Sequence, residues 1–292
     1  MPAEALQRKI KITQDLREIV SNMKTLSSVS ILQYEQASAI LDKYQHNLRD
    51  AFHALALHNG IPQFMSNNAI KQRYLFVLVG SDNGMVGRFN RDIIDAVKAF
   101  MKENKIAKAD AYFLTIGKRL SALAEQSGFN LLAGFATSNS VKSVINLTET
   151  VIMRVEKAIR MSRITDILTC FHYRDGAVSV ATDIKKILPF DNGAWHKLKY
   201  KRWETNNIPM LPVDNDKMFA ALVSEMLMIT VARHINSSLS AEHFTRMTNM
   251  QNAEKNIDEN LEKMNLVYQQ QRQEEITNEL IDVISGANAM QE

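Results

Sequence analysis

The stretch Ile12-Thr-Gln-Asp-Leu-Arg-Glu-Ile-Val-Ser-Asn-Met-Lys-Thr-Leu26 decides the fold, because its apolar residues recur at alternating spacings of four and three. This alternation holds one stripe of a helix against a partner helix, as in a coiled coil. The spacing continues with one phase slip, and neither Gly nor Pro occurs between Ala3 and Asn59. We predict one long helix over residues 1–58. Its expected seam is Ile12, Leu16, Ile19, Met23, Leu26, Ser30, Tyr34, Ala37, Leu41, Tyr44, Leu48, Ala51 and Leu55.

A second arm, from Asp214 to Ser285, also lacks Gly and Pro. Its apolar stripe is rich in Met, which fills irregular gaps between helices. We predict a second long helix over residues 214–287 that pairs antiparallel with residues 1–58. An ordinary helical bundle is the alternative, but no further helices long enough to complete one are predicted. The expected stripe is Leu222, Met226, Ile229, Leu239, Phe244, Met247, Met250, Ile257, Leu261, Met264 and Tyr268.

The segment between the arms has a different pattern, in which strands and helices alternate. The continuous apolar run Tyr74–Gly80 suits a buried strand, and it is followed by a turn and by helical periodicity. Such alternation predicts a mainly parallel sheet. The turn Arg174-Asp175-Gly176 lies between two further apolar runs and predicts an antiparallel hairpin. The expected fold is therefore a central Rossmann-like α/β domain over residues 72–200, joined to a long antiparallel coiled coil of the N- and C-terminal helices.

Composition excludes several classes of protein. A chain of 292 residues with 46% hydrophobic and 23% charged residues is globular, and its net charge of +3 is too small to argue for nucleic acid. The single cysteine, Cys170, allows no internal disulfide and fits a reducing compartment. The first twenty residues lack the apolar core of a signal peptide, and the apolar run Ala221–Ala232 is short and contains Glu225. We expect a soluble, cytoplasmic protein without membrane insertion.

A search for catalytic chemistry finds no convincing constellation. Residues Gly80–Gly87 follow a strand and precede a helix, where a phosphate loop would lie, but their spacing matches neither common phosphate-binding motif. A tight turn that requires small residues is the favoured interpretation. The seven histidines form no metal-binding motif. The basic aromatic stretch around Trp195 and Trp203 suits a loop or a protein interface better than a nucleic-acid site. We expect no cofactor, no metal and no catalytic residues.

Motifs at both ends of the chain and in one turn between them point to a known family. Near the C-terminus stands the pattern Ile276-Thr277-x-Glu279-x-x-Asp282-x-x-x-Gly286-Ala287-x-Ala289. The same helix carries, farther upstream, Glu242, Arg246, Met247, Met250, Asn256, Leu266, Val267, Tyr268, Arg272 and Gln273, and the opening helix carries Lys9, Ile10, Gln14, Ile19 and Met23. The turn between them is Ser81-x-x-Gly84-Met85-x-Gly87-x-Phe89-Asn90. In these motifs the chain resembles the gamma subunit of the F-type ATP synthase, whose terminal signature, helices and conserved turn have similar residues at these positions.

The resemblance implies a non-catalytic central-stalk rotor that couples ion flow through the membrane sector to ATP synthesis or hydrolysis on the beta subunits. Its implied partners are the alpha and beta subunits of the catalytic hexamer, the epsilon subunit and the ring of c subunits. The implied location is peripheral, at the cytoplasmic face of the bacterial inner membrane. The implied coupling residues are Met23, Arg246, Arg272, Gln273, Thr277 and Glu279, and Trp203 and Glu204 occupy the family's Tyr-Glu position near the c ring.

Some positions depart from the family pattern. Val86 stands where the family has Cys, Ser30 where it has Lys, and Thr205 where it has Pro. These departures indicate a divergent or second-copy bacterial form, and they leave open whether the coupling ion is the proton or sodium. Two other hypotheses share part of the pattern: a coiled-coil scaffold or tether with an α/β module, and a nucleotide-dependent enzyme that uses the Gly80–Gly87 turn.

Overall fold

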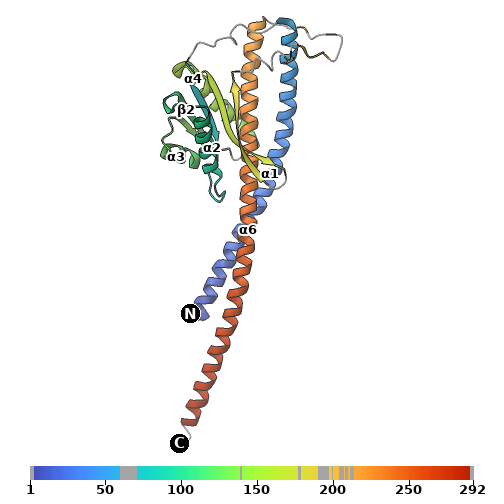
Figure 1. The fold of residues 1–292 in the computed structure, drawn as a ribbon. Helices are drawn as coiled ribbons and strands as arrows, with labels where there is room; N and C mark the ends of the chain where they lie inside the picture. Colours follow the sequence, from blue (N-terminus) through green and yellow to red (C-terminus); the bar gives the residue numbers. More distant parts are fainter. Residues whose placement is uncertain are drawn as a thin grey trace. The chain divides into compact units, whose positions relative to one another are not determined.

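The structure is a computed structural model that describes residues 3–59, 71–138, 140–176, 179–189, 197–198, 200–203, 207, 210 and 214–289. Its elements alternate between helix and strand in the middle of the chain and are long helices at the two ends (Figure 1). In order they are α1 (Ala3–Asn59), β1 (Tyr74–Val79), α2 (Phe89–Glu103), η2 (Lys108–Asp110), β2 (Ala111–Ile116), α3 (Lys118–Gln126), β3 (Leu131–Phe135), α4 (Val141–Ser162), β4 (Asp166–Asp175), β5 (Ser179–Leu188) and α6 (Asn215–Ala289).

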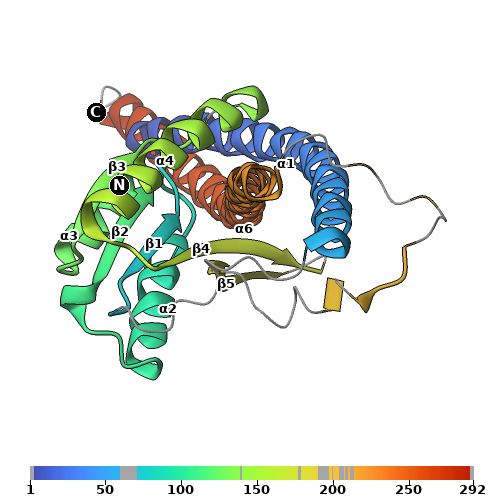
Figure 2. The ribbon, with the colours of Figure 1, turned by 90° about the horizontal axis from the view of Figure 1, so that it is seen from above.

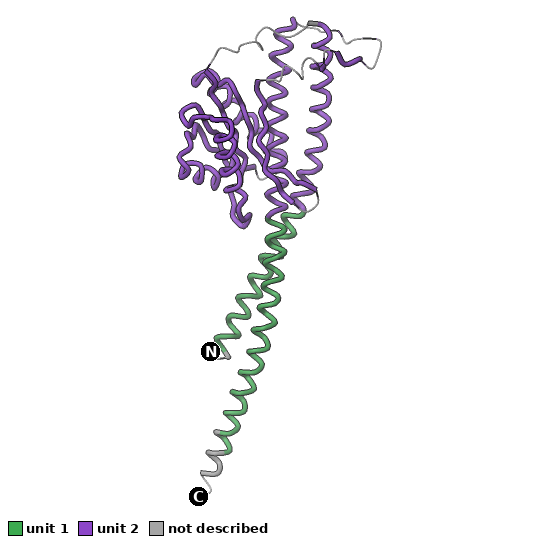
Figure 3. Tube along the Cα trace, in the orientation of Figure 1, with its two compact units in different colours: residues 1–28, 246–292 green, residues 29–245 purple. Residues whose placement is uncertain are grey.

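The chain divides into two compact units, coloured separately in Figure 3. Unit 1 consists of Met1–Ser28 and Arg246–Glu292, and unit 2 of Val29–Thr245. Both long helices contribute residues to both units. The sequence instead divides the chain into two helical arms, residues 1–58 and 214–287, and an α/β segment, residues 72–200. This division does not correspond to compact units, and it stays a prediction.

Unit 2 is built around a five-stranded sheet in the order β3-β2-β1-β4-β5. Strands β1 to β4 are parallel, and β5 pairs antiparallel with β4 from Asp175↔Ser179 onward. The predicted parallel sheet with an antiparallel hairpin is therefore confirmed. The central strand β1 is enclosed on both faces, because five of its six residues are buried. This explains why its sequence is a continuous apolar run rather than an alternating one.

Helices cover both faces of the sheet (Figure 2). On one face, α2 and α3 pack through Ile93, Val97 and Leu120 against Phe76 and Phe113 of the strands. On the other face, α4 and α6 lie against alternate residues of the same strands. The second core contains Leu75, Val77 and Val79 of β1, Val151 and Val155 of α4, and Leu227, Val231, Ile235 and Leu239 of α6.

The part of α6 within unit 2 thus belongs to the core of the α/β fold. Leu227, Val231, Ile235 and Leu239 are spaced by four and form one buried stripe. From the sequence we treated the C-terminal arm as a partner of the N-terminal helix alone, so this second role was missed. The packing also anchors the sheet to α6, since removing that stripe would expose one face of β1.

In unit 2, α1 and α6 run antiparallel, as contacts along the pair show. Tyr34 stacks on His243 with ring centroids 5.5 Å apart, and farther along the pair Asp42 binds Arg233 at 2.6 Å. Between these contacts, the Asn236 amide donates to the Tyr34 carbonyl oxygen at 2.7 Å. The predicted antiparallel pairing of the terminal helices is confirmed.

Unit 1 contains the continuation of both helices, again antiparallel. Arg17 binds Asp258 at 2.5 Å, and Lys24 binds Glu254. The seam predicted for this part of α1 is wrong, because Ile12, Leu16, Ile19 and Leu26 are 50–68% exposed. Among residues 4–31, whose burial the structure describes, the buried positions are instead Leu6, Ile10, Ser27 and Ile31.

The error has a physical reason. Two parallel stripes on α1 share the spacing of four and three, and the true seam carries polar or small residues, such as Thr13 and Ser27, at several of its positions. A pattern search selects the more apolar stripe, although that stripe faces solvent. From Tyr34 onward the predicted seam shares buried positions with the structure at Tyr34, Leu48 and Leu55.

Candidate functional site: the coupling residues and the β1 loop

Four of the predicted coupling residues lie together on the C-terminal part of α6. Arg272, Gln273, Thr277 and Glu279 are all exposed, and their positions fall on one half of the helix circumference at 3.6 residues per turn. The Thr277 hydroxyl donates to the Gln273 carbonyl oxygen at 2.8 Å within the helix. This face therefore presents charged and amide groups that are open to contact from outside.

Met23 and Arg246 differ from these four residues in exposure. Met23 is half-buried, and the Arg246 side chain is buried. Both lie in unit 1, as do the four exposed residues. Arg246 is therefore less accessible than the four exposed residues of α6.

Ion pairs that the sequence did not predict join the helices of unit 1. The Lys24 ammonium donates to the Glu254 carboxylate, and this bond holds the pKa of Glu254 below its usual value. The Arg17 guanidinium donates to Asp258, and the bond raises the pKa of Arg17. Neither pair could be found from the sequence, because their partners are separated by more than 200 residues and no register was known.

Unit 1 also exposes two sets of large apolar side chains. The first is the outward stripe of α1, which consists of Ile12, Leu16, Ile19 and Leu26. The second lies on α6 and consists of Ile276, Leu280, Ile281, Val283 and Ile284. Contiguous exposed apolar residues of this kind mark interaction surfaces in soluble proteins.

Trp203 lies in unit 2, apart from the other predicted residues in sequence. Its ring is 5.0 Å from that of His53, near the end of α1, and the His53 ring also contacts the Lys201 carbonyl oxygen through Nε2 at 2.9 Å. Glu204, predicted together with Trp203, lies outside the described residues.

The loop after β1 occupies the position of a phosphate loop, but its polar groups form hydrogen bonds with other residues of unit 2. Asn90 accepts from the Ser81 backbone N–H at 2.9 Å and donates to the Ser81 hydroxyl, also at 2.9 Å. The Asp82 carboxylate accepts from the backbone N–H groups of Lys118, at the start of α3, and Thr137. A carboxylate at a helix N-terminus occupies the place that a phosphate would take. Because a side chain at Gly80 would lie 2.4 Å from the Asn90 amide oxygen, the clamp also requires glycine there.

Val86 has a packing role in the same loop. Together with Phe89 it is buried against Ala241 of α6 and Val180 of β5. The small apolar side chain of Val86 thus fills a contact between the loop, α6 and β5.

Cys170 and the histidines that the structure describes form no evident chemical site. Burial raises the pKa of the Cys170 thiol, which keeps it protonated. Within the described ranges, no three His, Cys, Asp or Glu side chains gather as a metal site would require.

In the part of the chain that the structure describes, the stretch Asn215–Ile281 of α6 is long and apolar enough to cross a membrane by length and composition, with a mean hydropathy of 1.5 over eighteen residues. Core helices of soluble proteins pass the same test. In unit 2 this helix supplies Leu227, Val231, Ile235 and Leu239 to the buried core.

Comparison with known proteins decides the family. The family model described as ATP synthase matches residues 3–290. The chain belongs to the ATP synthase gamma family. The gamma chain of Bdellovibrio bacteriovorus is 25% identical over 98% of this chain and 97% of its own length. The gamma chain of Campylobacter curvus is 26% identical over 98% of each.

Solved structures share the fold of this gamma-family chain. The rotor of the Euglena gracilis mitochondrial ATP synthase aligns with a TM-score of 0.64 at 14% identity, over 94% of this chain and 98% of its own. The central stalk and c ring of the Tetrahymena thermophila enzyme gives a TM-score of 0.57 at 16% identity, over 80% of this chain and 99% of its own. The sheet flanked by N- and C-terminal helices is therefore the gamma-stalk architecture.

Proposed function

We propose that this gamma-family chain is the central-stalk rotor of a rotary ATP synthase. In this role it couples ion flow through the membrane sector to ATP synthesis or hydrolysis on the beta subunits and carries no catalytic site itself. The family match over residues 3–290 supports the assignment, and the likeness to solved rotors supports the fold. The observation that carries the proposal is the pair of exposed apolar surfaces on the two helices of unit 1.

An antiparallel helix pair suits torque transmission because it is asymmetric. Its α1 side presents the stripe Ile12, Leu16, Ile19 and Leu26. Its α6 side presents charged and amide groups around Arg272 and Glu279, interspersed with the exposed apolar set that begins at Ile276. Three equivalent neighbours around such a rod would each meet a different surface at a given angle. Different contact free energies at each angle shift the conformational equilibrium of each neighbour, and this is the physical basis of coupling.

The proposed partners follow from the surfaces and the family. The apolar stripes of unit 1 would contact the alpha and beta subunits, with Met23, Arg272, Gln273 and Thr277 at the beta subunits. Unit 2 would contact the epsilon subunit and the c ring, the latter near Trp203 and Glu204. The complex would lie peripherally at the cytoplasmic face of a bacterial inner membrane. The coupling ion, proton or sodium, is determined by the membrane ring.

The absence of a catalytic role is also part of the proposal. The internal bonds of the β1 loop support it, since Asn90 and Asp82 already occupy the donors that a nucleotide phosphate would need. The packing of α6 in the core of unit 2 supports a chain that does not insert into the membrane.

Reconstitution with alpha and beta subunits tests the proposal. We expect the chain to assemble with them and to stimulate ATP hydrolysis. The variant Ile12→Ser/Leu16→Ser/Ile19→Ser should weaken assembly, because each substitution removes an apolar side chain that would be buried against the partner subunits. The control Met153→Ser/Met161→Ser removes equally exposed apolar side chains from α4 and should assemble normally. Failure of the unaltered chain to associate with the hexamer would favour the scaffold hypothesis.

Coupling is tested by a second, charge-balanced pair of substitutions. In an enzyme reconstituted into vesicles, Arg272→Ala/Glu279→Ala should lower the number of ions pumped per ATP hydrolysed. The free energy of unfolding should change by only about 0.5 kcal/mol per site, because both side chains are exposed. The control Glu149→Ala/Lys157→Ala, on exposed positions of α4, should pump normally. Equal pumping by both variants would remove these residues from the proposed coupling surface.

A further inference from the structure

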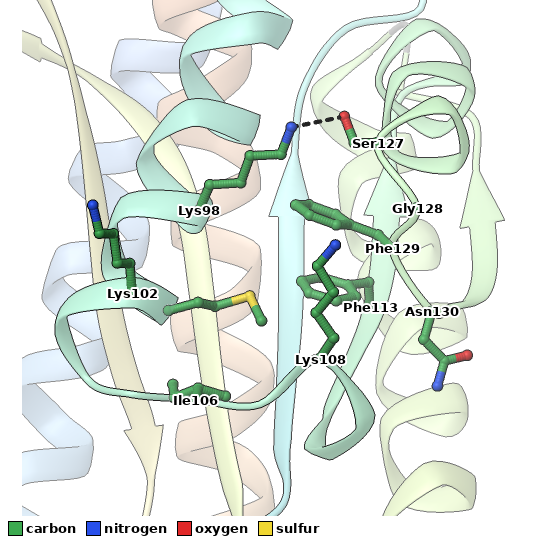
Figure 4. Close-up of a pocket in the computed structure, with 10 residues that line it drawn as sticks. Lys98, Lys102, Ile106, Lys108, Phe113, Ser127, Gly128, Phe129 and Asn130 are labelled. Atoms are coloured by element: carbon green, nitrogen blue, oxygen red, sulfur yellow. Dashed lines mark hydrogen bonds between the residues drawn. The ribbon is translucent and has the colours of Figure 1, made fainter.

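A pocket of about 340 Å³ lies in unit 2 beside the C-terminal ends of α2 and α3 (Figure 4). It is at the opposite end of the parallel strands from the β1 loop, since Phe113 is near the beginning of β2. Its volume is within the range of small-molecule sites. No part of the proposed rotor function uses it.

Two helix ends of the same type build the pocket. At the end of α2, Lys105 has a φ of 53°, and the Ile106 N–H donates to the Met101 carbonyl oxygen at 2.9 Å. At the end of α3, Gly128 has a φ of 71°, and the Phe129 N–H donates to the Ala124 carbonyl oxygen at 3.1 Å. Both are Schellman caps, which turn the following apolar residue back toward the helix. The caps therefore direct Ile106 and Phe129 into the pocket walls.

The pocket has an aromatic wall. The rings of Phe113 and Phe129 are stacked, with centroids 4.2 Å apart and planes 13° from parallel. Phe113 is in turn stacked on Phe76 at 5.3 Å inside the core. The Phe113 side chain is buried, whereas that of Phe129 is half-buried and forms the outer end of this row of rings. Met101 and Ile106 complete the apolar lining.

The rim of the pocket is cationic. Lys98 and Lys102 come from α2 and Lys108 from η2, and no carboxylate is among the described residues that line the pocket. The Lys98 ammonium lies 6.0 Å from the centre of the Phe129 ring and donates to the Ser127 hydroxyl at 3.3 Å. The side-chain ammonium groups of Lys102 and Lys108 have no hydrogen-bond or ion-pair partner among the residues that the structure describes. The pocket thus combines three positive charges with an apolar interior.

We propose that this pocket binds a small anion that carries a planar aromatic ring. The ring of the ligand would lie in the apolar interior against Phe129, because aromatic rings favour offset-stacked or edge-to-face contact. Its anionic group would remain at the rim, where Lys102 and Lys108 supply ammonium groups and the field is positive. An aromatic carboxylate and a nucleoside monophosphate share this chemistry, and they are the two sources to be distinguished.

Calorimetric titration of the full-length chain, without other subunits, tests the proposal. The probes are 1-naphthoate for an aromatic carboxylate, AMP for a nucleotide, and 1-naphthamide as a neutral analogue of the first. We expect saturable binding of at least one anion, weakened by added salt, and much weaker binding of the amide. Binding of naphthoate alone assigns the carboxylate source, and binding of AMP alone assigns the nucleotide source. Absence of binding by both anions, or equal binding of naphthoate and its amide, overturns the proposal.

Variants locate the binding. Lys102→Ala/Lys108→Ala should raise the dissociation constant roughly tenfold, because two screened charge contacts are lost. The control Lys142→Ala/Lys157→Ala removes two exposed lysines from α4 and should bind normally. Phe129→Leu keeps an apolar side chain and should weaken binding by roughly three- to tenfold. Because Phe129 is half-buried, the thermal midpoint of that variant is measured alongside. An unchanged affinity in the double lysine variant would exclude this pocket as the site.

Discussion

At the scale of single residues, side chains that resemble functional groups in sequence turn out to hold the fold together. Ser81 lies in the Gly80–Gly87 turn, which occupies the position of a phosphate loop, yet its backbone N–H and its hydroxyl are both bound by the Asn90 side chain of α2. Sequence spacing alone indicated a tight turn but could not reveal this clamp, since its two ends lie nine residues apart on different elements. The packing role of Val86 could not be predicted from the sequence either, because its contact with Ala241 of α6 depends on tertiary packing.

His234 leads to a prediction about acid stability. It lies on α6 and is buried against β4, where it stacks on Phe171 with ring centroids 3.9 Å apart and contacts the Thr169 hydroxyl through Nδ1 at 2.6 Å. Burial, with smaller effects from the nearby charges of Arg233 and Lys185, lowers its pKa to about 3. Between pH 6.5 and 3 the unfolded chain therefore binds a proton that the folded chain does not. The free energy of unfolding should fall by about 1 kcal/mol per pH unit over this window as pH decreases.

The measurement is urea unfolding between pH 7 and pH 4. In His234→Gln, whose amide can still contact Thr169, the slope should be shallower than in the unaltered chain. Part of the slope should remain, because burial also lowers the pKa of His172. The control His46→Gln changes an exposed histidine and should keep the full slope. Parallel pH profiles for the His234 and His46 variants would contradict this account.

At the scale of elements, the sequence predicted the sheet better than the helix surfaces. The bounds of β1 (Tyr74–Val79) agree with the predicted run Tyr74–Gly80, because a buried parallel strand is a short apolar run with clear ends. The seam of α1 was predicted on the wrong face near the N-terminus, where polar Ser27 is buried and apolar Leu26 is exposed. Periodicity shows that a stripe exists but not which of two stripes meets the partner helix.

Adjacent residues of α1 test the corrected seam. Ile31 is 8% exposed and Leu32 is 57% exposed, both within unit 2. Ile31→Ala should lower the free energy of unfolding by about 2–4 kcal/mol, because it removes buried methyl groups and leaves a cavity. Leu32→Ala should change it by less than about 1 kcal/mol. Chemical denaturation of the isolated chain compares the two, and a larger loss for the Leu32 variant would contradict the seam assigned from the structure.

At the scale of the whole molecule, the two units differ in how many of their described residues are buried. Unit 2 encloses β1 between two cores, whereas the described buried residues of unit 1 are few: Leu6, Ile10, Ser27, Arg246 and Met250. The sequence could suggest long helices and a domain between them. It could not show that α6 takes part in both units, because residues 227–239 have the same helical periodicity whether they meet a sheet or another helix.

This difference predicts two levels of hydrogen exchange in the free chain. Amides of β1 should open with about the global free energy of unfolding, whereas those of 4–28 in α1 should open at least about 2 kcal/mol more easily. Ile235→Ala should speed exchange in β1, and Ile10→Ala should speed exchange in 4–28, because each removes buried apolar surface from its own unit. If the proposed rotor assembles, protection of 4–28 should rise in the complex as its exposed stripe is covered. Equal protection of both segments in the free chain would mean that the ion pairs Arg17–Asp258 and Lys24–Glu254 stabilise unit 1 far more than partly exposed pairs ordinarily do.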